Sequence, residues 1–184
     1  MAILQASTRT GQEHTLRCTD EGTLLVQAIT ETEIEHASGK GNAWSFDSGE
    51  RDIDAGDTML FVRNDSDRPM VLDHLEINGS NVICTWEVYV GTAQVTAAGA
   101  GAVIPTNLNT RFAGADSDTT AFYDETAHAD GSLVSRVKTA ISGFHDLDLT
   151  GVVLQKNHWI QVNQETESTS GSVIAHAHFQ DEIS

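Results

Sequence analysis

The stretch Val82–Val90, VICTWEVYV, alternates between two sets of side chains along its whole length. Successive side chains of a β-strand point to opposite faces of the sheet, so every second residue shares a face. One set is wholly apolar and consists of Val82, Cys84, Trp86, Val88 and Val90. The other set contains Thr85 and Glu87. This period of two predicts a strand with one face in the protein core.

Short runs rich in β-branched and aromatic residues continue on both sides of this stretch, with turn-forming clusters between them. The runs are His14–Cys18, Thr23–Thr30, Ala43–Asp47, Thr58–Arg63, Met70–Ile77, Leu133–Ile141, Gly151–Leu154, His158–Gln164 and Ser172–Phe179. We expect one hairpin across the turn Asn64–Pro69 and another across the polar loop Glu165–Gly171. Because no long amphipathic helix is evident, the sequence predicts an all-β fold, an antiparallel β-sandwich that is jelly-roll-like.

A chain of 184 residues fits one domain. Residues 1–13 are polar and lack periodicity, which predicts an N-terminal arm, and residues 14–184 then form the single sandwich domain. The Gly-, Ala- and Asp-rich region around residues 91–132 predicts a long loop excursion. Within it, Thr120–Ala129 is compatible with one or two helical turns.

The charge balance excludes some partners. The chain has 27 acidic and 10 basic residues, a formal net charge of -17. Nucleic acids and anionic membranes attract Lys and Arg, so we expect this chain to bind neither. No secretory signal and no membrane-spanning segment are expected. The acidity indicates adaptation to salty water or, as the alternative, an acidic face that meets a basic partner.

His176 and His178 are two residues apart on a predicted strand, so they point the same way and could share a metal ion. Cupin barrels begin their metal site with such a pair, but they also need a carboxylate and a later histidine. No later histidine exists, and a third ligand would have to be His74, His145 or His158. We therefore expect outward-facing or hydrogen-bonded histidines and no metal site, with a metal site as the alternative.

No catalytic apparatus is evident. The chain lacks the Gly-x-Ser-x-Gly elbow and any phosphate-binding glycine loop, and its acidic clusters, such as Asp52, Asp54 and Asp57, do not match a calcium-binding EF-hand. We expect no enzymatic activity and no cofactor. Trp44 lies beside a Gly-rich loop and is the best candidate for an exposed aromatic residue, which leaves a glycan-binding module as an alternative function.

Several segments resemble the auxiliary head proteins of tailed bacteriophages, which bind over the capsid lattice as cement or decoration proteins. The segments are Glu33–His36, Ala43–Phe46, Gly56–Asn64, Pro105–Asn109 and Val153–His158. The resemblance implies a β-sandwich or jelly roll, often a homotrimer, that binds the major capsid protein at the outer surface of the virion. It contributes no catalytic residues. A tail, neck or head-fibre component is the alternative within the virus particle.

A protein that clamps a lattice needs apolar anchors that become buried at the interface. Phe112, Phe122 and Tyr123 are aromatic residues of the long loop region, and with Trp44 they are the expected partner-interface residues. The alternative for the first three is that they pin the loop to its own core.

Overall fold

The computed structural model describes residues 33–79, 82–92, 101–123, 131–166 and 168–180, together with the backbone of two short strands near the N-terminus. These two strands, β1 (Gln5–Ser7) and β2 (Glu13–Thr15), pair with each other in an antiparallel manner. They belong to a unit formed by residues 1–32 and 182–184. The second unit, Glu33–Asp181, contains the sandwich. The run Thr23–Thr30 lies outside the described residues.

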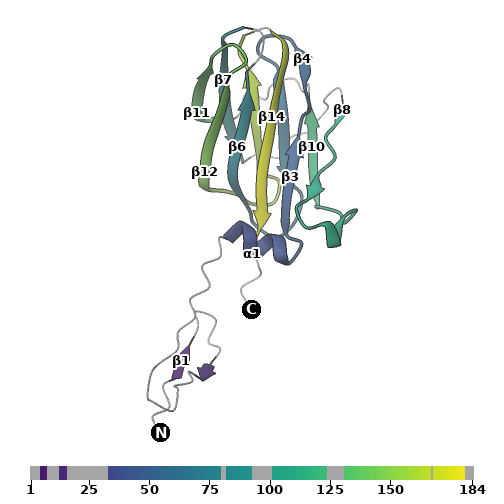
Figure 1. Cartoon of the computed structure of the whole chain (residues 1–184), viewed down its shortest axis with the longest axis vertical. Coiled ribbons are helices and arrows are strands. Elements are labelled where there is room, and N and C mark those ends of the chain that lie inside the picture. Colours follow the sequence, from purple (N-terminus) through teal and green to yellow (C-terminus); the bar gives the residue numbers. More distant parts are fainter. Residues whose placement is uncertain are drawn as a thin grey trace. The chain divides into compact units, whose positions relative to one another are not determined.

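The second unit consists of two antiparallel sheets that lie face to face, as Figure 1 shows. The first sheet contains, in spatial order, β11 (Ser132–Thr139), β7 (Cys84–Gly91), β13 (Trp159–Gln164), β5 (Thr58–Asn64), β10 (Thr119–Tyr123) and β8 (Gly101–Ala102). The second contains β12 (Phe144–Leu154), β6 (Met70–Asn78), β14 (Ser168–Phe179), β3 (Ala43–Asp47) and β9 (Thr106–Asn107), and β4 (Arg51–Ile53) pairs with β14. The predicted all-β sandwich is confirmed.

The chain changes sheet at nearly every connection between the long strands. It crosses from β5 to β6 to β7, and again from β11 to β12 to β13 to β14. The resulting four-stranded orders, β12-β6-β14-β3 and β11-β7-β13-β5, are those of a jelly roll, in which neighbouring strands are distant in sequence.

Both predicted hairpins are therefore wrong, because β5 and β6, like β13 and β14, lie in different sheets. The turn after β5 is fixed by the buried Asn64 side chain, whose Nδ2 donates to the carbonyl oxygens of Arg68 and Leu154, both at 2.8 Å. Its Oδ1 accepts from the backbone N–H of Ser66 at 2.9 Å. These bonds tie the turn to the end of β12 and direct the chain across the core instead of back along its own sheet.

The core lies between the two sheets. The apolar face predicted for β7 is confirmed, because Cys84, Trp86 and Val88 are fully buried and pack with residues of both sheets. The Trp86 indole N–H donates to the Thr139 hydroxyl at 3.0 Å, which links β7 to β11 inside the core. Large buried side chains from both sheets, such as Phe46 on β3 and Met59 on β5, fill the space between the sheets.

The described part of the region around residues 91–132 contributes strands and is not only a loop. β10 pairs with β5, β8 pairs with β10, and β9 pairs with β3. The predicted helical turns over Thr120–Ala129 are wrong where the structure describes them, since Thr119–Tyr123 is a strand. A 3-10 turn, η1 (Thr110–Phe112), and one short helix, α1 (Glu33–Gly39), complete the described elements. Within the described residues, no helix has both the length and the hydropathy needed to cross a bilayer.

Glu87 points away from the core but is buried at the sheet surface, where it accepts hydrogen bonds from the Tyr89 hydroxyl and from Arg136 Nε. The Tyr89 hydrogen bond is the main cause that lowers the pKa of the Glu87 carboxyl, and Arg136 adds to it while burial opposes it. A lowered folded-state pKa means that the carboxylate stabilises the fold above its unfolded-state pKa of 4.5, and that this stabilisation is lost as the pH falls through the lower folded-state value.

We therefore expect Glu87→Gln to make the loss of unfolding free energy below about pH 4.5 less steep than in the unmodified protein. Chemical denaturation at a series of acidic pH values measures this slope. The pKa of the neighbouring Glu165 is raised, by burial and by the charge of Glu87. Its contribution to the pH dependence therefore falls above pH 4.5, and the two proteins are compared below that pH. Asp67→Asn, at an 87% exposed side chain, is the matched control, and parallel curves for the unmodified protein and Glu87→Gln would contradict the expectation.

Candidate functional site

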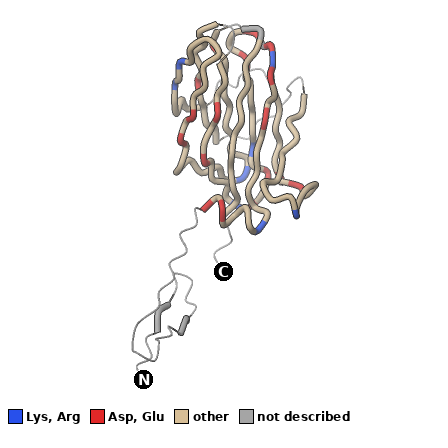
Figure 2. The backbone as a smooth tube through the Cα atoms, in the orientation of Figure 1, with Lys and Arg blue, Asp and Glu red and all other residues tan. Residues whose placement is uncertain are grey.

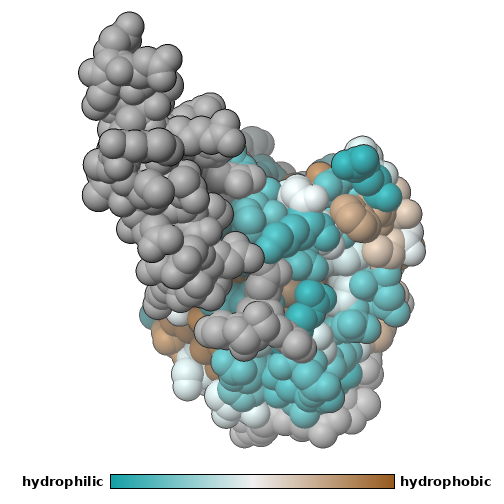
Figure 3. Space-filling view, turned by 90° about the horizontal axis from the view of Figure 1, so that it is seen from below, coloured by the Kyte–Doolittle hydropathy of each residue, from teal (hydrophilic) through white to brown (hydrophobic). Residues whose placement is uncertain are grey.

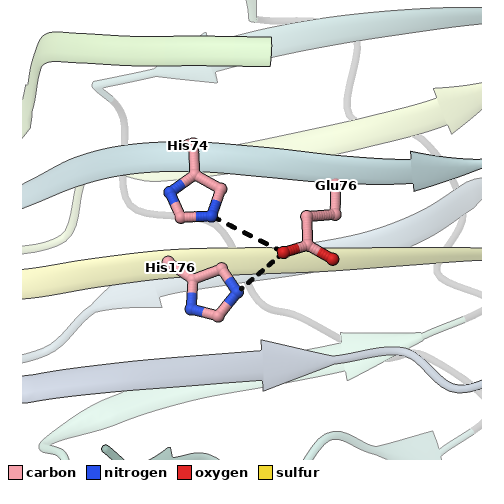
Figure 4. Close-up of side chains that lie close together, drawn as sticks. All are labelled: His74, Glu76 and His176. Carbon is pink, nitrogen blue, oxygen red and sulfur yellow. Dashed lines mark ion pairs between the residues drawn. The ribbon is translucent and has the colours of Figure 1, made fainter. Parts of the chain in front are cut away.

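Two histidines and a glutamate gather on the outer face of the second sheet. His74 lies on β6 directly opposite His176 on β14, and Glu76 follows His74 on the same face of β6. The core-facing residues between them are Leu75 on β6 and Ala175 and Ala177 on β14. The strand alternation that buries these residues therefore turns His74, Glu76 and His176 outward. Figure 4 shows the three side chains converging above the two strands.

The three side chains are close enough to bind one ion. The imidazole rings of His74 and His176 are stacked, with centroids 4.4 Å apart and planes inclined by 18°. Nε2 of His74 lies 3.7 Å and Nε2 of His176 lies 3.6 Å from the same Glu76 oxygen, Oε1. One potential ligand atom from each residue lies within 4.8 Å of the others, and this is the one such group of three among the described residues.

The neighbouring strand β12 adds negative charge. Its register places Asp146 opposite Glu76 and Asp148 opposite His74. The pKa of the Asp148 carboxyl is lowered, chiefly because Thr150 donates hydrogen bonds to it and also because of His74. Burial and then His74 lower the pKa of His176, against the opposite pull of Glu76, Asp73 and Asp146. The sheet thus holds imidazole nitrogens beside carboxylates and favours the neutral form of His176.

His178 does not join this group, which corrects the interpretation that His176 and His178 share one site. Asp73 is skipped in the pairing of β6 with β14, where His176 faces His74 and Ala177 faces Leu72. Nδ1 of His178 lies 3.0 Å from both carboxylate oxygens of Asp73, and Nε2 lies 3.8 Å from Glu33 of α1. His178 is a buried, hydrogen-bonded residue, whereas a metal site shared by His176 and His178 was the alternative in the sequence analysis.

Of the three proposed third ligands, only His74 lies beside His176. His145 pairs with Ile77 from β12, and His158 precedes β13 in the other sheet. Sequence analysis missed Glu76 altogether. The sequence contains the two short patterns that supply the site, His74-x-Glu76 and His176-x-His178. They indicate a common site only when β6 is known to pair with β14.

The expected partner-interface residues lie in different environments. Trp44 is only 3% exposed and belongs to the core, so it cannot contact a partner from this position. Phe112 is 41% exposed, although its ring also packs on Gly41, where a Cβ atom would lie 2.5 Å away. Tyr123 is partly buried against the core and lies under the Arg51 guanidinium at 3.8 Å, and Phe122 is partly buried on β10. Tyr123 therefore matches the alternative in which the aromatic residues pin this region to its own core.

Three exposed apolar residues, which sequence analysis missed, lie near the end of the sandwich where β11 turns into β12. Ile83, Ile141 and Phe144, here called the apolar tip, are 53%, 61% and 61% exposed. Cys84 pairs with Thr139, and the backbone N–H of Gly79 donates to the Gly143 carbonyl, so the residues that precede β7 lie beside the β11–β12 turn. The sequence feature that could have indicated this site is the turn pair Ser142-Gly143 with the apolar residues Ile141 and Phe144 on its two sides.

Charged residues are distributed over the described part of the sandwich. Acidic residues are spread over α1 and the strands and outnumber the basic ones, as Figure 2 shows. The end of the sandwich that carries α1 is mostly hydrophilic, with hydrophobic residues in small separate patches (Figure 3). Exposed large apolar residues also occur elsewhere, such as Ile104 at 84% and Leu133 at 47% exposure, and three of them belong to the apolar tip.

No family model, curated protein or solved structure matches this chain. The jelly-roll arrangement is used by viral capsid proteins, lectins and cupins alike, so the fold does not select among these functions. The function must therefore be inferred from the positions of the functional side chains in this structure.

Proposed function

We propose that this chain is a structural protein of a virus particle, a decoration or cement protein that binds the outer surface of the major capsid lattice. The observation that carries the proposal is the apolar tip on an otherwise acidic, well-packed jelly roll. The resemblance of several segments to auxiliary head proteins of tailed bacteriophages supports the same function.

The apolar tip has the properties of an interface anchor. Exposed apolar side chains that gather at one place on a soluble protein mark sites of interaction. Interface free energy is concentrated in a few such side chains that become fully buried. Ile141 lies in the tight turn closed by the Gly143 N–H and the Ala140 carbonyl, and Phe144 follows this turn. Both are 61% exposed, so a complementary pocket can take up both without a change in the sandwich.

The acidity fits this use. Like charges keep free copies of the chain apart and soluble. A lattice with basic groups around an apolar pocket would attract the acidic surface and then bury the tip, and this complementarity would speed association. Many weak contacts on one shell would reinforce each other if the protein binds as a homotrimer, since each further contact is intramolecular.

The glycan-binding and enzymatic alternatives require side chains in positions that this structure does not provide. The glycan-binding alternative relied on an exposed Trp44, which is buried. A cupin-like enzyme would hold its metal ion inside the barrel, whereas His176 lies on the outer face and large side chains fill the interior.

Co-sedimentation of the purified chain with assembled capsid shells of the virus that encodes it tests the proposal. We expect saturable binding, with a stoichiometry that is a simple multiple or fraction of the number of shell subunits. Electron cryo-microscopy of the saturated shells should show added density on their outer surface. Binding to purified tails and not to shells would overturn the capsid assignment, and absence of binding to either would overturn the structural role.

A further inference from the structure

We propose that His74, Glu76 and His176 bind one divalent transition-metal ion of the zinc class on the outer face of the second sheet. Zinc prefers imidazole nitrogen and carboxylate oxygen, usually four ligands in a tetrahedron, and open sites combine three protein ligands with a water molecule. Two imidazoles and one carboxylate supply such a set. This inference is independent of the proposed capsid role.

The distances agree with a nearly formed site. Metal–ligand bonds of about 2.0–2.2 Å in a tetrahedron place the ligand atoms roughly 3.3–3.6 Å from one another. The two observed Nε2–Oε1 distances are 3.6 and 3.7 Å, and both nitrogens approach the same carboxylate oxygen. Small side-chain rotations are sufficient to bring all three atoms around an ion, because no pair among them is separated by more than 4.8 Å.

The strands hold the ligands in place before an ion binds. His74 and His176 are a directly opposed pair in the antiparallel β6–β14 pairing, and the backbone of each strand is fixed by neighbours on both sides. Ligands on rigid strands lose less conformational freedom on binding than ligands on loops. Because β6 and β14 are inner strands of their sheet, the geometry does not depend on a mobile edge.

The electrostatic environment favours a cation over an empty site. Asp146 and Asp148 lie on β12 opposite Glu76 and His74, and Asp73 lies next to His74 on β6. Asp146 and Asp148 attract a divalent ion and can orient the imidazole ligands from outside the coordination sphere, whereas both oxygens of Asp73 lie against His178.

The ligand type selects the class of metal. Imidazole suits Zn²⁺, Cu²⁺ and Ni²⁺, whereas Mg²⁺ and Ca²⁺ prefer sites made wholly of oxygen ligands. The side chains of His74 and Glu76 are 35% and 34% exposed, so the fourth coordination position faces solvent and is open to water.

Isothermal titration of Zn²⁺ into the metal-free full-length chain at neutral pH tests the inference. We expect one zinc ion per chain to bind at this site, and His176→Gln or Glu76→Gln to weaken that binding by at least about 100-fold, since even residues outside the coordination sphere alter metal affinity by about 10–100-fold. His158→Gln is the matched control, because this partly buried histidine precedes β13 of the first sheet. It should bind zinc as the unmodified chain does. Mg²⁺ should not compete.

Two further readouts separate loss of the site from loss of the fold. Co²⁺ should give the intense visible absorption of a tetrahedral complex with the unmodified chain and not with His74→Gln. Zinc should raise the melting temperature of the unmodified chain and of His158→Gln, but not that of the ligand variants, because only a native-state site links binding to stability. Equal zinc affinity in the unmodified chain, His176→Gln and Glu76→Gln, or no preference for Zn²⁺ over Mg²⁺, would overturn the inference.

Discussion

Replacing Trp86 with alanine is expected to lower the free energy of unfolding by about 3–5 kcal/mol, the range for removal of a large aromatic side chain from a packed core. Trp86 is fully buried at the centre of β7, and its indole N–H donates to the Thr139 hydroxyl at 3.0 Å. The cavity cannot close easily, because the ring lies between two sheets whose strands are held by their own hydrogen bonds. Urea denaturation followed by circular dichroism measures the change.

Two companion variants divide this effect into its parts. Trp86→Phe keeps most of the ring and should cost less than Trp86→Ala. Thr139→Val removes the hydrogen-bond acceptor while nearly keeping the volume, and leaves the buried indole N–H unpaired, so it should cost about 1–3 kcal/mol. A loss below about 1 kcal/mol for Trp86→Ala would show that β7 does not lie in the core as described.

Replacing Ile141 and Phe144 together with aspartate is expected to weaken binding to capsid shells by at least about 100-fold. Two anchors at the centre of an interface contribute about 2 kcal/mol or more each, and the new charges add an unfavourable desolvation. Both side chains are 61% exposed in the free chain, so the double variant should unfold at the same denaturant concentration as the unmodified protein. Quantitative co-sedimentation over a range of chain concentrations measures the affinity.

Ile104→Asp is the matched control, because Ile104 is 84% exposed and lies between β8 and β9, away from the apolar tip. It should bind shells as tightly as the unmodified chain. The assignment of the tip would be contradicted if the double variant bound normally, or if Ile104→Asp alone abolished binding.

The strands could be predicted from the sequence where alternation was clear. The run Val82–Val90 shows its buried face through Cys84, Trp86 and Val88, and β7 occupies nearly the same residues. The pairing of the strands could not be predicted in this way. Turn residues such as Asn64–Pro69 report a change of direction but not whether the chain returns along its own sheet or crosses to the other one. In this jelly roll it crosses, and β5 pairs with β13 and β10.

The candidate metal site depended on the same missing information. His176 was recognised from its own strand, but its partner His74 is opposite only because β6 pairs with β14. The irregular pairing at Asp73 then separates His178 from the group, and no local pattern indicates it. Helix α1 was missed because it has only seven residues and buries only Ala37, too little for a helical period to emerge.

The copy number of the chain in purified virus particles from its source tests the proposed capsid role most directly. Quantitative mass spectrometry, with the major shell protein as the internal reference, gives this number. A capsid decoration protein should be present at a ratio near one to the shell protein, or at a simple fraction set by the symmetry of the lattice. A few to a few dozen copies would assign the chain to the tail, neck or vertices, and its complete absence from particles would contradict a structural role in the virion.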